Sequence, residues 1–119
     1  MSSLFRFIHM QGSRYNQGKL KWSLVDWESL EPLVQVLMFG ANKYAPYNWQ
    51  KGLKVTETME SCLRHIHSFL SGEDNDIESG LSHLGHAEAN LHFAIWMLKN
   101  RPDMDDRHKK EEKQLKLGL

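Results

Sequence analysis

Two imidazoles and one amide are spaced to fall on one face of a helix in the segment SGLSHLGHAEANLHFAIWM, residues 79–97. His83, His86 and Asn90 stand at i, i+3 and i+7, and residues at these intervals project from one side of a helix. Imidazole nitrogens bind metal ions, and all three side chains can hydrogen-bond to a polar ligand. Ala87 and Ala94 are small and leave room for that ligand. We therefore expect a polar site inside a helical bundle.

A second polar stripe precedes it, formed by Glu57, Glu60, Arg64 and His67 at i, i+3, i+7 and i+10. Such a stripe often faces solvent, and the Glu60–Arg64 pair alone would contribute only about 0.3 kcal/mol. However, a loop of roughly ten residues joins the two segments, and helices connected this way are usually antiparallel neighbours. The stripe is therefore either a solvated face or the second half of a site that faces the histidines.

The connecting loop GEDNDIESG, residues 72–80, carries four carboxylates within six residues. It is not an EF-hand, because the twelfth position counted from Asp74 is Gly85, where a bidentate glutamate is needed. Two interpretations stay open: a solvated acidic turn that caps the next helix, or a source of outer metal ligands. The sequence has no HD dipeptide, HExxH, Walker A loop or paired CxxC, which argues against the corresponding hydrolases, proteases, P-loop proteins and zinc fingers.

Three helices must position these residues, and the sequence shows almost no strand pattern, so the predicted fold is an all-α bundle. The first helix is expected at 26–42, the second at 55–71, and the third covers the histidine segment. Three principal helices per chain make a thin core, which predicts completion by a homo-dimer or homo-tetramer. The core faces expected from apolar spacing are Leu30, Leu33, Val34, Leu37, Met38 and Ala41; Met59, Leu63, Ile66 and Leu70; and Leu84, Leu91, Ile95 and Leu98.

Composition excludes several classes of function. The 119 residues fit one domain, and 15 basic residues balance 15 acidic ones, so no basic field indicates a nucleic-acid polymer as partner. No apolar run is long enough for a membrane span, and the first residues lack the order of a secretory signal. The single cysteine, Cys62, is expected to pack in the core, and its presence without a partner favours the cytoplasm.

Three segments together resemble a known family: RYNQGKLKWSLVDWESLEPLVQVLMFGANKYAPYNWQKGL, ESCLRHIHSFLSGEDNDIESG and SHLGHAEAN. They look like the phage and bacterial dATP/dGTP diphosphohydrolases, which are related to MazG-like all-α nucleotide pyrophosphohydrolases. The resemblance divides the chain into an N-terminal extension (1–13), a MazG-like nucleotide-binding helical domain (14–100) and a charged tail (101–119). For a phage protein, the compartment would be the host cytoplasm.

The resemblance implies an oligomeric enzyme that cleaves a purine deoxynucleoside triphosphate between its α and β phosphates. Products would be the monophosphate and pyrophosphate, and a divalent cation, Mg²⁺ or Mn²⁺, would be required. The related MazG pattern is ExxE followed by ExxD on the next long helix. Glu57 and Glu60 fit the first half, whereas His83 and His86 replace the acids of the second. Because imidazole suits manganese, iron, cobalt or zinc better than magnesium, the resemblance leaves another transition metal open.

The roles implied by the resemblance fall into three groups. Metal ligands would be Glu57, Glu60, His83 and His86, with Glu57, Glu60 and Arg64 also assigned to catalysis. Substrate binding would involve Lys19, Lys43, Asn48, Trp49, His65 and Asn90, where the lysines meet phosphates and Trp49 with the two asparagines contacts the base.

Two other functions compete with hydrolysis. A non-catalytic phage protein, a sponge, would sequester a cyclic or ADP-ribose-type nucleotide signal in the same pocket. Replacement of the expected acids by His83 and His86 is the feature that favours this alternative. A purely structural helical module would explain the apolar faces but not the polar stripes.

Overall fold

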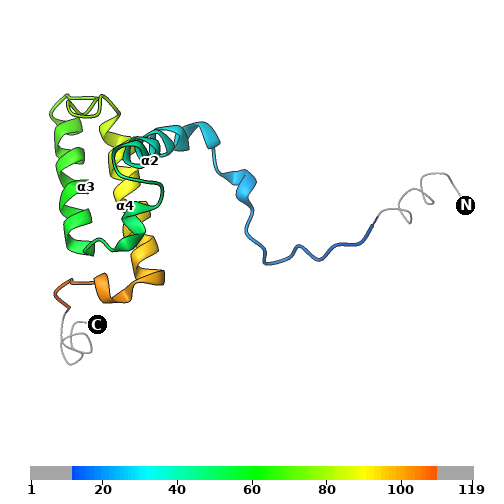
Figure 1. The fold of residues 1–119 in the computed structure, drawn as a ribbon. Coiled ribbons are helices and arrows are strands. Elements are labelled where there is room, and N and C mark those ends of the chain that lie inside the picture. Colours follow the sequence, from blue (N-terminus) through cyan, green and yellow to red (C-terminus); the bar gives the residue numbers. More distant parts are fainter. Residues whose placement is uncertain (1–11, 110–119) are drawn as a thin grey trace, which may run out of the picture.

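The computed structural model describes residues 12–109, which fold into three α-helices and four short 3-10 helices (Figure 1). Within this range there is no strand, only an isolated bridge between Asn75 and Ser82. None of the helices in this range is long and apolar enough to cross a membrane. The predicted all-α class is confirmed.

The first α-helix, α2, spans Glu31–Lys43 and follows two 3-10 turns, η1 (Trp22–Leu24) and η2 (Trp27–Leu30). Sequence periodicity placed its start at residue 26, one turn too early. Asp26 accepts hydrogen bonds from the backbone N–H and the hydroxyl of Ser29, and so caps the 3-10 turn instead. Pro32 then occupies the first turn of α2, where a missing N–H costs nothing.

The two remaining helices begin and end close to the predicted positions. Helix α3 spans Val55–Leu70, and Gly72 follows it with a positive φ of 99° that glycine adopts without strain. Helix α4 spans His83–Asn100. Its N-cap is Ser82, whose hydroxyl accepts hydrogen bonds from the backbone N–H groups of Leu84 and Gly85.

Helices α3 and α4 run antiparallel side by side, and α2 packs across α4 (Figure 1). Gly85 permits the contact between α2 and α4, since a Cβ built on it would lie 2.7 Å from the carbonyl oxygen of Pro32. Residues 12–30 lead away from this body as an extended arm, on which Trp22 and Trp27 are each 64% exposed.

The buried faces of the helices differ from those predicted. Leu84, Leu91, Ile95 and Leu98 are 43–57% exposed, whereas the buried side of α4 carries the small or polar residues His83, Ala87, Asn90 and Ala94 together with Met97. Helix α4 is apolar on most of its circumference, so its amphipathic pattern did not identify the face that meets α3. Small side chains at the contact let the two helices approach closely, which leaves the leucines outside.

The other two helices depart from the prediction only in part, and on α2 the predicted core residues Leu33, Leu37 and Ala41 are half-buried. On α3, Val55, Thr58 and Cys62 are buried, as predicted for Cys62, while Leu63, Ile66 and Leu70 are exposed. Met59 packs on the core, as predicted. On α2, Val36 is the buried residue, and the predicted core residues Val34 and Met38 are 49% and 60% exposed.

The beginning of the charged tail packs on the body. A short turn, η4 (Pro102–Met104), follows α4, and Arg101 donates a hydrogen bond to the carbonyl oxygen of Lys51. Asp106 accepts hydrogen bonds from the backbone N–H and the hydroxyl of Thr56, in the first turn of α3. The first residues of the charged tail are therefore held against the body by side-chain hydrogen bonds. Residues 1–11 of the predicted extension and 110–119 of the tail lie outside the described residues.

Candidate functional site

Three histidines from two helices meet where α3 ends and α4 begins. His65 reaches from α3 toward α4, and its Nδ1 lies 2.8 Å from Nδ1 of His83. The ring of His86 stacks on that of His65, with centroids 4.4 Å apart and planes inclined by 6°. His83 is only 4% exposed. The antiparallel packing thus brings together the two predicted histidines of α4 and a third histidine, His65, expected to bind substrate.

The acidic loop adds a carboxylate to this cluster. It folds back over the start of α4, where the N–H of His83 donates to the carbonyl oxygen of Asp74 and the N–H of Asp76 to that of Leu81. The Asp76 carboxylate accepts hydrogen bonds from the backbone N–H and the hydroxyl of Ser79, which hold it against the histidines. One donor atom each from His65, Asp76 and His83 lies within 4.8 Å of the others. The residue that caps α4 is Ser82 and not a carboxylate of the loop. One loop carboxylate, Asp76, does lie beside the histidines, as the second interpretation of the loop requires.

Burial determines the charge of these groups. It lowers the pKa of both His65 and His86, so that both rings are neutral near pH 7. Burial raises the pKa of Asp76, but hydrogen bonds from Ser79 outweigh it and leave this pKa below its ordinary value. The site therefore combines neutral imidazole nitrogens with an anionic oxygen, a donor set suited to first-row transition metals.

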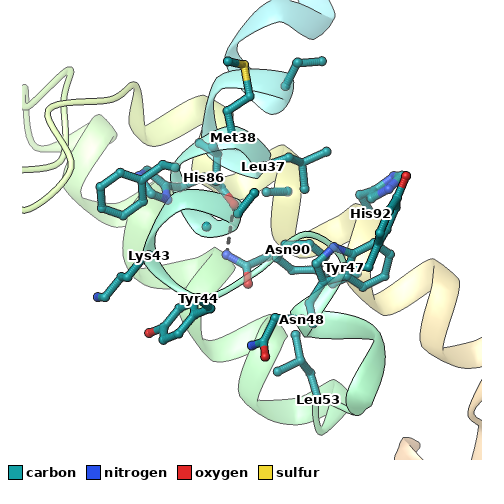
Figure 2. A pocket seen from close by; sticks show the side chains of 18 of the residues that line it. Leu37, Met38, Lys43, Tyr44, Tyr47, Asn48, Leu53, His86, Asn90 and His92 are labelled. Carbon is teal, nitrogen blue, oxygen red and sulfur yellow. Dashed lines mark hydrogen bonds between the residues drawn. The ribbon is translucent and has the colours of Figure 1, made fainter.

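A cavity of about 690 Å³ opens beside the cluster, between α2, the 44–49 loop and the two long helices (Figure 2). His65, Asp76 and His86 line one part of it. Aromatic side chains line much of the remainder, namely Phe39, Tyr44, Tyr47, Trp49 and Phe93. Its size and its mixture of apolar walls and a few polar groups are typical of a small-molecule site.

The loop after α2 shapes the cavity through one left-handed residue. Tyr47 has a φ of 60°, and this turn directs η3 (Asn48–Lys51) back toward α4. Trp49 then packs on Phe93 and Trp96 of α4, at centroid distances of 4.9 and 5.2 Å. Trp49 therefore anchors the loop and lines the cavity at once.

Five of the six predicted substrate-binding residues line the cavity: Lys43, Asn48, Trp49, His65 and Asn90. The Asn90 amide donates hydrogen bonds to the carbonyl oxygen of His86 and to the hydroxyl of Ser61. Lys43 forms an ion pair of 2.8 Å with Glu78, and the hydrogen bond raises its pKa. The sixth, Lys19, is exposed on the N-terminal arm and does not line the cavity.

The structure does not assemble the predicted metal set within this chain. Glu57, Glu60 and Arg64 are exposed, and none of them lines the cavity. Helix α3 turns Val55 and Cys62 toward α4, which leaves positions 57, 60 and 64 on its far side. The two polar stripes therefore do not face each other, and the carboxylate beside the histidines comes from the loop.

Sequence reasoning missed Asp76, Glu73 and Ser79 as individual site residues. Glu73 Oε2 lies 3.5 Å from Nε2 of His83, and the Ser79 hydroxyl lies at hydrogen-bond distance, 2.7 Å, from Nε2 of His86. The feature of the sequence that indicated a role for this loop was its density of carboxylates. Nothing in their spacing identified the one that turns inward.

Comparison with known proteins gave one family and one curated relative. Residues 9–107 match the family described as dATP/dGTP diphosphohydrolase, N-terminal. The protein named dATP/dGTP diphosphohydrolase from Salmonella phage PMBT28 is 41% identical over 98 residues, which cover 82% of this chain and 33% of the phage protein. The chain thus spans about a third of that relative's length. No solved structure matches the chain. The resemblance to the dATP/dGTP diphosphohydrolase family, stated from the sequence, is confirmed.

Proposed function

The chain belongs to the dATP/dGTP diphosphohydrolase N-terminal family, and on this premise we propose that it binds and hydrolyses purine deoxynucleoside triphosphates. Water would attack the α-phosphorus, the bond from that phosphorus to the bridging oxygen would break, and the monophosphate and pyrophosphate would leave. The observation that carries the proposal is the adjoining position of an aromatic cavity and a His/Asp cluster.

The aromatic part of the cavity is suited to a purine base. Tyr44, Tyr47 and Trp49 supply ring faces for stacking. Both hydrogens of the Asn90 amide are used within the protein, so its oxygen is the group left for a ligand. An amide oxygen accepts from the exocyclic amino group of adenine or of guanine, which is consistent with the two bases in the family's name.

The polar part of the cavity would take the triphosphate. Lys43 can exchange its partner Glu78 for a phosphate oxygen, because that pair is partly exposed and weak. A divalent cation held by His65, Asp76 and His83 would act as a Lewis acid, offsetting phosphate charge and acidifying the attacking water. The Asp76 carboxylate would accept a proton from that water.

One observation favours the sequestering alternative. The carboxylates Glu57 and Glu60, which the MazG pattern would use for catalysis, lie outside the cavity, whereas the aromatic rings proposed to stack on a base line it. A protein built this way can retain a nucleotide without cleaving it.

The deciding experiment incubates the chain with each of the four dNTPs and either Mn²⁺ or Mg²⁺, followed by nucleotide chromatography. Purine monophosphate and pyrophosphate in equal amounts are expected. Stoichiometric retention of unaltered nucleotide would exclude hydrolysis and support sequestration.

A matched pair of variants tests the assignment of the base. Asn90→Ala should raise KM for dATP and dGTP about tenfold, equivalent to about 1.4 kcal/mol. Asn100→Ala is the control, because Asn100 is on the same helix and also donates to the carbonyl oxygen four residues earlier, but is exposed away from the cavity. Equal effects from both variants would contradict the assignment.

We also propose that the chain is a homo-oligomer in the cytoplasm. The exposed apolar residues of α3 and α4 lie roughly a quarter turn from the line joining the two helices. Because the helices are antiparallel, both sets reach the same side, away from α2. We call this surface the leucine face; it comprises Leu63, Ile66, Leu70, Leu84, Leu91, Ile95 and Leu98. Contiguous apolar surface of this kind usually marks a protein interface.

A further inference from the structure

We propose that His65, His83 and Asp76 form a mononuclear centre for a first-row transition metal ion, with Glu73 as the residue that positions His83. The inference deepens the proposed function and rests on it for the purpose of the ion.

The first observation is the orientation of two imidazoles. The Nδ1 atoms of His65 and His83 point at each other across 2.8 Å. Metal–nitrogen bonds of about 2.0–2.1 Å place neighbouring ligand nitrogens about 3 Å apart, so these two atoms need to separate by only a few tenths of an ångström. In the metal-free chain one ring donates its Nδ1–H to Nδ1 of the other. A cation between them would replace that proton and bind a lone pair of each nitrogen.

The second observation concerns the other nitrogen of His83. Nε2 is buried and has no hydrogen-bond partner among residues 12–109, and the Glu73 carboxylate lies 3.5 Å away. When Nδ1 binds a metal ion, the ring proton must sit on Nε2, which is the atom that faces Glu73. A histidine that ligates through one nitrogen and donates to a carboxylate through the other is the usual arrangement in metal sites. Ligation would therefore give this proton a partner.

Asp76 supplies the third ligand and leaves room for others. Hydrogen bonds from Ser79 already hold the Asp76 carboxylate beside the rings. The Asp76 side chain is 24% exposed, so it can make a small adjustment toward an ion. His65 and Asp76 line the cavity, whereas His83 lies beneath them. The coordination positions left open would thus face the cavity, where phosphate oxygens or water can enter.

The donor set also determines which ion is preferred. Two nitrogen ligands and one carboxylate suit Mn²⁺, Co²⁺ or Zn²⁺, whereas Mg²⁺ favours oxygen ligands and retains its waters. His86 stacks on His65 and bonds to Ser79, so it supports a ligand rather than acting as one. The chain would then bind a transition metal, as the sequence allowed, but through ligands that differ from the expected set of Glu57, Glu60, His83 and His86.

The test is titration of the untagged full chain with Co²⁺ in the absence of nucleotide, followed by visible absorption and calorimetry. One equivalent per chain should bind with a ligand-field band. Zn²⁺ should displace it, and millimolar Mg²⁺ should not. Binding of no Co²⁺, or full displacement by Mg²⁺, would overturn the inference.

Three variants, two with matched controls, locate the site. His65→Ala should abolish the band, whereas His67→Ala, an exposed histidine two residues away, should retain it. Asp76→Asn should weaken binding strongly, and Asp74→Asn in the same loop should not. Glu73→Gln should lower affinity about 10- to 100-fold while keeping the band, as expected for a positioning residue. Equal losses in His65→Ala and His67→Ala would refute the site.

The two proposals fail separately. Specific Co²⁺ binding without turnover of any dNTP would leave the metal centre standing and exclude hydrolysis. Turnover of dATP by a wild-type chain that binds no Co²⁺ would refute the centre and leave the hydrolase.

Discussion

Substitution of Gly85 by alanine tests the close contact between α2 and α4, two of the helices whose residues line the cavity. The added Cβ would lie 2.7 Å from the carbonyl oxygen of Pro32 and 2.9 Å from its carbonyl carbon. Both are backbone atoms, so no side-chain rotation relieves the overlap. Ordinary contact begins at 3.4 Å, and the helices must therefore separate by up to about 0.7 Å.

Two opposing contributions determine how much Gly85→Ala changes the free energy of unfolding. Overpacking of this kind costs about 1–3 kcal/mol. Alanine in place of glycine inside a helix returns up to about 1 kcal/mol. The net loss in the free energy of unfolding should be about 1 kcal/mol, or roughly 4–8 °C in Tm.

Gly40→Ala is the control that isolates the steric term. Gly40 lies inside α2, and a Cβ there would meet nothing within 4 Å. The Gly40→Ala variant should gain up to about 1 kcal/mol in the free energy of unfolding from helix propensity alone. The difference between the two variants, measured as urea midpoints with unchanged m-values, then equals the overpacking cost of about 1–3 kcal/mol. Equal stabilisation of both variants would refute the close packing of α2 on α4.

Three further outcomes are expected. Met97→Ala should lower the free energy of unfolding by about 2–5 kcal/mol in urea denaturation, because Met97 is fully buried at the centre of the core; a loss below 1 kcal/mol would contradict this. Stability of the metal-free chain should fall as the pH drops below about 6.5. Burial lowers the pKa of His65 and His86 in the folded chain, so the unfolded chain binds more protons at low pH. An unchanged urea midpoint between about pH 7.5 and 5.5 would contradict this expectation. Leu91→Asp on the leucine face should shift light scattering toward the monomer while Gln35→Asp on α2 does not, and a wild-type chain that is already monomeric would exclude self-association.

Helix positions could be read from the sequence because the signals that set them are local. Ser82 caps α4 and Gly72 follows the end of α3, and both act within a few residues of the chain. The start of α2 was misplaced for a local reason too, since Asp26 caps a 3-10 turn as readily as an α-helix.

The buried face of each helix was harder to predict. Apolar spacing identified a stripe of leucines on α4, but a helix that is apolar on most sides can turn either stripe inward. Ala87 and Ala94 allow α3 to approach closely, and the leucines remain on the surface. Oligomerisation, which the sequence also predicted, would offer those leucines a second burial site.

The sequence by itself determined three helices, the family, and the presence of a polar site around His83 and His86, because periodicity, capping and motif order are all properties of neighbouring residues. Only the tertiary structure decided which carboxylate lies beside these histidines. Glu57 and Glu60 were the candidates by motif, yet the rotation of α3 needed to bury Cys62 turns them outward. Asp76 takes their place because its loop folds over the start of α4, and such a path depends on contacts between segments that are distant along the chain.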